Sequence, residues 1–287
     1  MLPTPDTSHV PYARVYEPAE DSFLLLDTLS SASETAFLSS RFGPSTSTST
    51  SASTKTAPAP LVLEVGPGSG VVVAFLAAHA RAIFGRADVL AAAVDVNRFA
   101  CAATAATAAK AVSSVSSSSD LKSESGAGCF LDAVQGDLTA PLRAGVVDVL
   151  VFNPPYVPTE ALPQPPPETS PDAEGETTFE EDSHLLALSY AGGRDGMETT
   201  ERLLAALPLT LSAARGCAYV LLCAGNRPDD VKARVRAWDT DTDSAERPWR
   251  AETVGLSGKQ AGWEKLQIVR IWRDLLVVVV VRMGVVN

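Results

Sequence analysis

Short apolar runs alternate along the chain with segments whose apolar residues recur at the spacing of a helix. The runs predict β-strands, because each is brief and strongly apolar. They cover residues 61–65, 89–94, 129–134, 146–152, 218–223 and 266–271. The helical segments cover residues 71–79, 98–111, 197–211 and 228–238. This alternation predicts an α/β fold with a largely parallel sheet and helices on both faces.

A further helix is expected near the start of the chain. Pro18, Glu20 and Asp21 suit a helix N-terminus, because proline fits the first turn and carboxylates favour the positive end of the helix dipole. The expected buried face carries Phe23, Leu26 and Leu29.

Three low-complexity stretches, residues 43–60, 113–128 and 163–182, interrupt this pattern. They are rich in serine, threonine, proline or acidic residues, and cannot bury enough apolar area to offset the entropy of ordering them. We therefore interpret them as surface loops. Each neighbouring segment is an isolated strand or helix that needs partners, so residues 1–273 are expected to form one domain. Residues 274–287 form a C-terminal tail of unassigned role.

Composition favours a globular protein and argues against nucleic acid as a partner. The 287 residues are 46% hydrophobic and 20% charged, as is usual for folded proteins. The formal net charge is −11, whereas broad binding to nucleic acid needs a basic surface that displaces counterions. Part of this charge is local, because residues 168–182 contain seven acidic side chains and no basic one.

Neither a metal centre nor a membrane span is expected. The four cysteines form no Cys-x-x-Cys pair and the three histidines stand far apart, so the cysteines are interpreted as buried free thiols. The longest apolar runs have eight residues, far below the roughly 20 that cross a bilayer. The first 20 residues show no secretory signal or typical transit peptide, so a cytoplasmic or nuclear location is expected.

Candidate chemistry lies at the ends of the strands, since ligands of open α/β sheets bind beyond the carboxyl ends. After the first strand, Glu64 precedes Gly66, Gly68 and Gly70, which allow a tight turn and close approach of a ligand. A dinucleotide site would have G-x-G-x-x-G, but here the third glycine comes one residue early. The acid would repel phosphate and suits a ligand with ammonium and sulfonium groups. A simple strand-to-helix turn is the alternative.

Acidic residues also follow the second and third strands. Asp95 is placed to accept hydrogen bonds from both hydroxyls of a ribose, which indicates adenosine. Asp137 and Leu138 are placed to meet the adenine, the carboxylate at its amino group and the leucine against its ring. Alternatively, Asp137 caps the next turn.

The fourth strand runs into Asn153, Pro154, Pro155 and Tyr156, the most specific feature of the chain. The prolines stiffen the loop and remove its N–H donors. The Asn153 oxygen and the Pro154 carbonyl can accept both hydrogens of a planar NH₂ group, which leaves the nitrogen lone pair directed at an electrophile. These four residues are the candidate catalytic set, and a proline turn that only ends the strand is the alternative.

Together these motifs resemble class I S-adenosylmethionine-dependent methyltransferases that act on nitrogen. Residues 15–27 (VYEPAEDSFLLLD) are similar to the opening of the eukaryotic HemK-like enzymes, and residues 191–196 and 256–264 to later stretches. The resemblance covers roughly residues 9–273 apart from the loops. It implies a single Rossmann-like domain with a seven-stranded, mostly parallel sheet in the order 3-2-1-4-5-7-6.

For function, the resemblance implies methylation of the glutamine in the Gly-Gly-Gln loop of the eukaryotic peptide-chain release factor, with S-adenosyl-L-methionine as cofactor and no metal. Asn153 to Tyr156 match the substrate clamp. Ser22, often threonine in the family, matches a cofactor contact. The other residues expected at the cofactor are Glu64, Gly66, Gly68, Asp95, Asp137, Leu138 and Asn153.

The resemblance also implies a small zinc-binding activator subunit that completes a heterodimer. In the expected strand order, residues 129–134 form an edge of the sheet, and the unpaired backbone groups of an edge invite pairing. The activator is expected at this edge, unless the 113–128 loop protects it.

Three other functions remain as alternatives. N-P-P-Y also occurs in methyltransferases that act on the adenine amino group of nucleic acids, although the net charge and the missing target-recognition domain argue against this reading. Some relatives are associated with methylation of a histone lysine, which the same pocket could admit. A cofactor-binding scaffold without catalysis is disfavoured by the intact N-P-P-Y.

Overall fold

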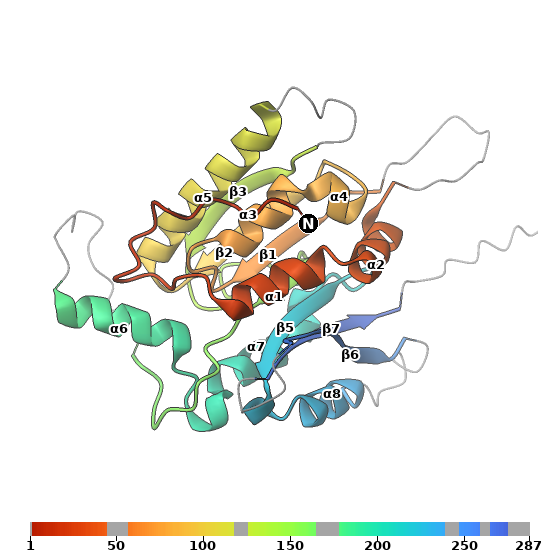
Figure 1. Ribbon diagram of the computed structural model, residues 1–287. Helices are drawn as coiled ribbons and strands as arrows, with labels where there is room; N and C mark the ends of the chain where they lie inside the picture. The colour runs from red at the N-terminus through yellow and green to blue at the C-terminus, as the bar shows by residue number, and fades with distance from the viewer. Residues whose placement is uncertain are drawn as a thin grey trace, which may run out of the picture.

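The protein is built on a seven-stranded sheet, whose strands lie among the helices in the computed structural model (Figure 1). The structure describes residues 2–44, 57–117, 126–164, 178–238, 247–258 and 265–274. The strands are β1 (Leu61–Val65), β2 (Leu90–Asp95), β3 (Cys129–Gln135), β4 (Val149–Phe152), β5 (Cys217–Cys223), β6 (Trp249–Leu256) and β7 (Leu266–Arg273). Their order is β3-β2-β1-β4-β5-β7-β6, with β1 to β5 parallel and β7 antiparallel to both neighbours. The predicted α/β class and strand order are therefore confirmed.

Helices cover both faces of this sheet. One face is covered by α1 (Glu20–Leu29), α2 (Ala32–Phe42), α3 (Val71–Ala78), α4 (Ala80–Phe84) and α5 (Arg98–Ser117). The other is covered by α7 (Glu198–Thr210) and α8 (Pro228–Arg236). The remaining described helices are α6 (Phe179–Tyr190) and two short 3-10 turns, η2 (Arg194–Gly196) and η3 (Ala224–Asn226).

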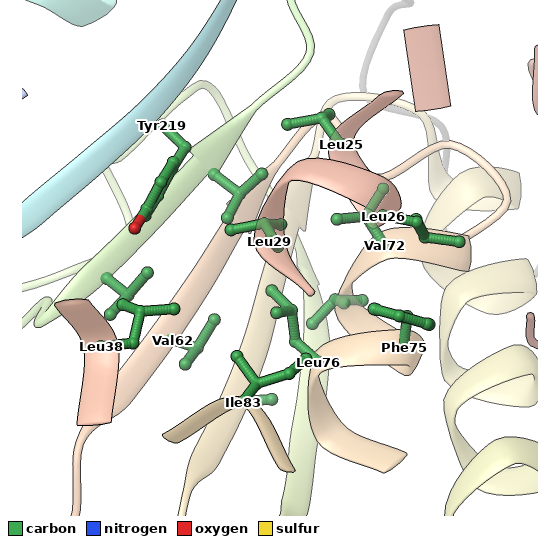
Figure 2. Close-up of a cluster of buried hydrophobic side chains, with 14 of the residues drawn as sticks. Leu25, Leu26, Leu29, Leu38, Val62, Val72, Phe75, Leu76, Ile83 and Tyr219 are labelled. Atoms are coloured by element: carbon green, nitrogen blue, oxygen red, sulfur yellow. The ribbon is translucent and has the colours of Figure 1, made fainter. Parts of the chain in front are cut away.

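Consecutive residues of the central strands alternate between two buried clusters. In β4, Val149 and Val151 pack with the α1–α4 side, whereas Leu150 and Phe152 pack with α7 and α8. Figure 2 shows part of the first cluster, in which side chains of α1 to α4 meet β1 and Tyr219 of β5. Because both faces are buried, these strands are apolar throughout, which explains why the apolar runs predict them.

The apolar pattern does not predict α2, α6 or β6. Both helices mix polar with apolar residues, and each begins at a capping residue. Ser31 accepts the Glu34 N–H at 3.3 Å ahead of α2, and Thr178 forms a capping box with Glu181 ahead of α6. Strand β6 lies at an edge of the sheet and mixes charged with apolar residues, so it forms no apolar run.

The predicted loops are also too long. Helix α5 continues to Ser117 and α6 begins at Phe179, so parts of the predicted 113–128 and 163–182 loops are helical. The parts of the predicted loops, motif and tail that lie outside the described residues are 45–56, 118–125, 165–177, 259–264 and 275–287.

Two predictions of burial are wrong. Phe23 is 44% exposed, because the buried stripe of α1 passes instead through Ser22, Leu25, Leu26 and Leu29, the i, i+3, i+4, i+7 positions of one helix face. The interpretation of all cysteines as buried fails at one position: the four thiols are free, but the one on edge strand β3, Cys129, is exposed. Within the described ranges, no helix is both long and apolar enough to cross a membrane.

Candidate active site

A cavity of about 290 Å³ opens beyond the carboxyl ends of β1, β2 and β4. Residues from α1 and from the ends of the first four strands meet in its wall. The predicted site residues that line the cavity are Ser22, Glu64, Gly66, Gly68, Asp95, Asp137, Leu138, Asn153 and Pro155. Two members of the N-P-P-Y motif, Pro154 and Tyr156, do not belong to this wall. The structure thus brings together nearly all the residues that the sequence places at the site.

Three glycines shape the turn between β1 and α3. Gly66, Gly68 and Gly70 have φ angles of +62°, +54° and +77°, a left-handed region that other residues rarely adopt. A Cβ on Gly70 would lie 2.6 Å from the Cα of Thr104, so only glycine lets α3 begin this close to α5. At Gly66 the nearest described atom to such a Cβ would be 3.9 Å away, on Phe152. The turn is therefore tightly packed at its end and open toward the cavity at its start.

Two carboxylates in the wall, Glu64 and Asp95, have no basic partner within the described ranges. Glu64 is 2% exposed and accepts the Val73 N–H at 2.7 Å. Burial, helped by nearby Asp95, raises the pKa of Glu64 to about 8. Asp95 accepts the N–H groups of Asn97 at 2.8 Å and of Gly68 at 3.3 Å, yet burial raises its pKa to about 6. No arginine or lysine in the described part of the chain offsets either shift, so the wall favours a ligand that brings positive charge and hydroxyl donors.

The loop after β3 forms another part of the wall. Leu138 has φ +50°, unusual for leucine, and faces the cavity. The Asp137 carboxylate pairs with Arg202 of α7, which also lines the cavity. Both side chains of this pair are about half exposed, at 52% and 53%. The carboxylate is thus bonded across the cavity wall rather than to the turn that follows it.

The N-P-P-Y corner presents an oxygen without a partner. The Oδ1 atom of Asn153 is buried and has no hydrogen-bond partner among the described residues. Such an unsatisfied acceptor costs about 1–3 kcal/mol and is rare in folded proteins. Pro154 behind it is buried, and the Tyr156 hydroxyl lies 3.4 Å from the carboxylate of Asp21. An N–H donor bound in the cavity would satisfy the Asn153 oxygen.

Sequence reasoning missed several residues of the wall. Tyr16 precedes α1, Leu185 and Leu188 belong to α6, and Arg202 belongs to α7. Tyr16 lies inside the 15–27 stretch that carries the family resemblance, which was a usable signal. The α6 leucines follow an acidic stretch and belong to no motif, so nothing in their sequence surroundings marks them.

The donors and acceptors of the wall suit S-adenosylmethionine, a nucleoside that carries ammonium and sulfonium groups. Buried Glu64 favours a cation, Asp95 offers an acceptor for ribose hydroxyls, and the empty Cβ position of Gly66 leaves the backbone open to a ligand. A phosphate-bearing ligand would meet two carboxylates, so these residues fit a cationic adenosine better than a dinucleotide.

Comparison with known proteins agrees with this reading. No family model matches the chain. Methyltransferase HEMK2 of Mus musculus is 33% identical over 278 residues, which cover 94% of this chain and 96% of that protein. The eRF1 methyltransferase catalytic subunit mtq2 of Schizosaccharomyces pombe is 32% identical, over 95% of this chain and 96% of that protein. A solved class I S-adenosylmethionine-dependent methyltransferase from Listeria monocytogenes is more distant, with a TM-score of 0.43 at 12% identity over 92% of this chain and 64% of that one.

The mouse and Schizosaccharomyces pombe proteins are each more than 30% identical to this chain over nearly the whole length of both sequences. The chain also has a cavity whose wall suits a sulfonium nucleoside. The chain therefore belongs to the HEMK2 family of class I methyltransferases, enzymes that take their methyl group from S-adenosylmethionine.

Proposed function

We propose that this enzyme methylates the side-chain amide nitrogen of the glutamine in the Gly-Gly-Gln loop of the eukaryotic peptide-chain release factor. The observation that carries the proposal is the buried Asn153 Oδ1 in the cavity wall, an acceptor for which the described part of the chain offers no donor. A planar amide supplies the N–H donor that this oxygen lacks. The name of the Schizosaccharomyces pombe relative, an eRF1 methyltransferase catalytic subunit, supports the release factor as substrate.

The chain acts on this reaction mainly by alignment. An amide nitrogen is a weak nucleophile, because its lone pair is delocalised into the carbonyl group. Bound S-adenosylmethionine supplies an electrophilic methyl group. Asn153 accepts a hydrogen of the substrate amide, and the prolines that follow hold its oxygen in place. Alignment of this kind can offset about 7–11 kcal/mol of a barrier. The nitrogen can lose its proton once it becomes cationic, so no strong base is required beside it.

Methyl transfer to the purified release factor tests the proposal. With labelled S-adenosylmethionine, mass spectrometry should find the methyl group on the glutamine of the Gly-Gly-Gln peptide. A release factor with alanine in place of this glutamine is the matched control and should stay unlabelled. Label in DNA or RNA, or on a histone lysine, with none on the release factor would replace the proposal by the corresponding alternative. Cofactor binding without a single turnover on any of these would indicate a scaffold.

We also propose which residues hold the cofactor. Glu64 faces the ammonium group, Asp95 accepts the ribose hydroxyls, and Asp137 with Leu138 meets the adenine. Their positions in one cavity wall support this assignment. The remaining proposed contacts are Ser22, Gly66, Gly68 and Asn153.

Binding of S-adenosylmethionine at pH 7 is expected to release about one proton. With a pKa of about 8, Glu64 is mostly protonated in the cofactor-free enzyme at pH 7, and a nearby cation would lower this pKa. Affinity should therefore rise with pH up to about 8. In the cofactor-free enzyme, the stability due to this raised pKa is complete below pH 4.5 and is lost as the pH rises through about 8.

Calorimetric titration in buffers of different ionisation enthalpy measures this proton release. The control is Glu64→Gln, which cannot release the proton, so its binding heat should no longer depend on the buffer. Wild-type binding without such dependence would contradict the proposed role of Glu64.

The exposed edge of the sheet supports a further proposal, that the enzyme is the catalytic subunit of a heterodimer in the cytoplasm or nucleus. Strand β3 pairs with β2 alone among the described strands. Its Leu131 and Val134 are 53% and 45% exposed, although a water-facing edge usually carries polar residues. We propose that a small zinc-binding activator subunit covers these side chains.

Leu131→Asp is expected to prevent copurification of the activator while the melting temperature changes by no more than about 2 °C, because the side chain is already exposed. The control is Leu209→Asp, a leucine of α7 rather than β3 that is 73% exposed, and it should retain the partner. An enzyme that is monomeric, soluble and fully active when expressed alone would contradict the activator proposal.

A further inference from the structure

Asp21 lies beside the candidate active site, outside the cavity wall and outside the predicted site residues. We infer that Asp21 is a positioning residue, whose carboxylate holds the Tyr156 side chain of the acceptor corner and the Tyr16 side chain of the cavity wall in the geometry needed for methyl transfer. This inference rests on the proposed function, because it assigns a role in that same reaction.

The contacts of Asp21 join three separate segments. Its Oδ2 atom accepts the Tyr16 hydroxyl at 2.9 Å and lies 3.4 Å from the Tyr156 hydroxyl. Its Oδ1 atom accepts the Ser22 N–H at 2.6 Å and the Ser22 hydroxyl at 3.2 Å. One carboxylate thus connects the segment before α1, the first turn of α1 and the N-P-P-Y corner.

The surroundings of Asp21 are unusual for an acid. The residue is 3% exposed, and its described partners are hydroxyl groups and one backbone N–H, with no arginine or lysine among them. Burial of a carboxylate costs free energy that the helix N-terminus and neutral donors offset only in part. A leucine would fill the same space without that cost. Unlike leucine, a carboxylate can accept hydrogen bonds from two tyrosine hydroxyls at once, which explains why an acid occupies this position.

Tyr16 and Tyr156 connect the Asp21 carboxylate to the cavity wall and to the N-P-P-Y corner. Tyr16 lines the cavity, and a Cβ on Gly68 would lie 3.4 Å from the Tyr16 Cβ, so this side chain packs against the glycine turn. Tyr156 directly follows Pro155, a wall residue. Loss of the carboxylate would remove the acceptor that both hydroxyls share and loosen the corner that holds Asn153. A displacement of about 1 Å at such a corner can cost about 100-fold in rate.

Fluorine NMR tests the positioning directly and needs no substrate. The enzyme has five tyrosines, so 3-fluorotyrosine gives a simple spectrum, in which Tyr16→Phe and Tyr156→Phe assign the two signals. Asp21→Asn should shift and broaden both signals. The matched control is Asp27→Asn, an exposed acid on the same helix, and it should leave both unchanged. Unchanged Tyr16 and Tyr156 signals in Asp21→Asn would overturn the inference.

Steady-state kinetics with the release factor as substrate test the effect of Asp21 on the rate of methyl transfer. Asp21→Asn should lower kcat by about 30-fold, with the Kd for S-adenosylmethionine raised by no more than about threefold, since misplacement affects rate more than binding. Tyr156→Phe should lower kcat by about tenfold. The kcat of the double variant Asp21→Asn/Tyr156→Phe should lie within about threefold of that of Asp21→Asn, because the two substitutions remove the same interaction. The inference would be overturned if the losses of kcat in the two single variants multiplied in the double variant, or if Asp21→Asn left kcat unchanged. A wild-type enzyme that is inactive on the release factor would overturn the proposed function instead, and the tyrosine signals would then decide the role of Asp21.

Discussion

Asn153→Ala is expected to lower kcat for release-factor methylation by about 100- to 1,000-fold while binding of S-adenosylmethionine weakens by no more than about tenfold. The reason is the unpartnered Asn153 Oδ1, which has no bond in the described structure for alanine to disrupt. Removal of this oxygen should therefore cost the alignment of the substrate amide and little else. Kinetics and calorimetric titration measure the two effects separately.

A second variant tests whether activity depends on an oxygen acceptor at position 153 or on the asparagine side chain as a whole. Asn153→Asp keeps an acceptor of the same size and should retain more activity than Asn153→Ala, although its charge disturbs the orientation. Equal loss of turnover and of cofactor binding in Asn153→Ala would contradict the clamp, because it would show that Asn153 mainly holds the cofactor. Full activity in the alanine variant would contradict it as well.

The sequence predicts the centre of this site well, for a physical reason. Glu64 lies near the end of β1, Asp95 ends β2 and Asn153 follows β4. Because the other residues of these strands are apolar, these polar residues stand out. The ends of parallel strands meet at one edge of the sheet, which brings these side chains into one cavity although they are far apart in sequence. The strand order itself followed from the family resemblance and not from the alternation.

The outer parts of the site could not be predicted in the same way. Leu185 and Leu188 reach the cavity from α6, a helix whose start is set by a capping box and whose buried residue is Leu185. Arg202 lines the cavity and pairs there with Asp137, 65 residues away. Asp21 was predicted as a helix start, and its contact with Tyr156 spans 135 residues. Such contacts depend on tertiary packing, which local patterns do not encode.

One buried polar network away from the site also escaped the sequence pattern, and removal of its cation alone is expected to be strongly destabilising. Glu34 of α2 is 1% exposed, and both its oxygens accept from Nη1 of Arg270 on β7, at 2.9 and 2.8 Å. The Tyr219 hydroxyl of β5 donates to the same carboxylate at 2.7 Å. The Arg270 guanidinium also lies 3.8 Å from the centre of the Phe37 ring. This network fastens α2, which the apolar pattern did not predict, to the antiparallel side of the sheet.

Arg270→Met is accordingly expected to lower the free energy of unfolding by about 3–5 kcal/mol, because it leaves the Glu34 carboxylate buried without a cation. The double variant Glu34→Leu/Arg270→Met should recover most of this loss, since an apolar pair of similar volume removes the stranded charge. The control is Arg250→Met, which breaks the half-exposed pair with Asp274 and should cost no more than about 1 kcal/mol. Urea unfolding measures all three variants. A loss for Arg270→Met as small as that of the control would show that Tyr219 and the surrounding dipoles alone keep the buried carboxylate stable.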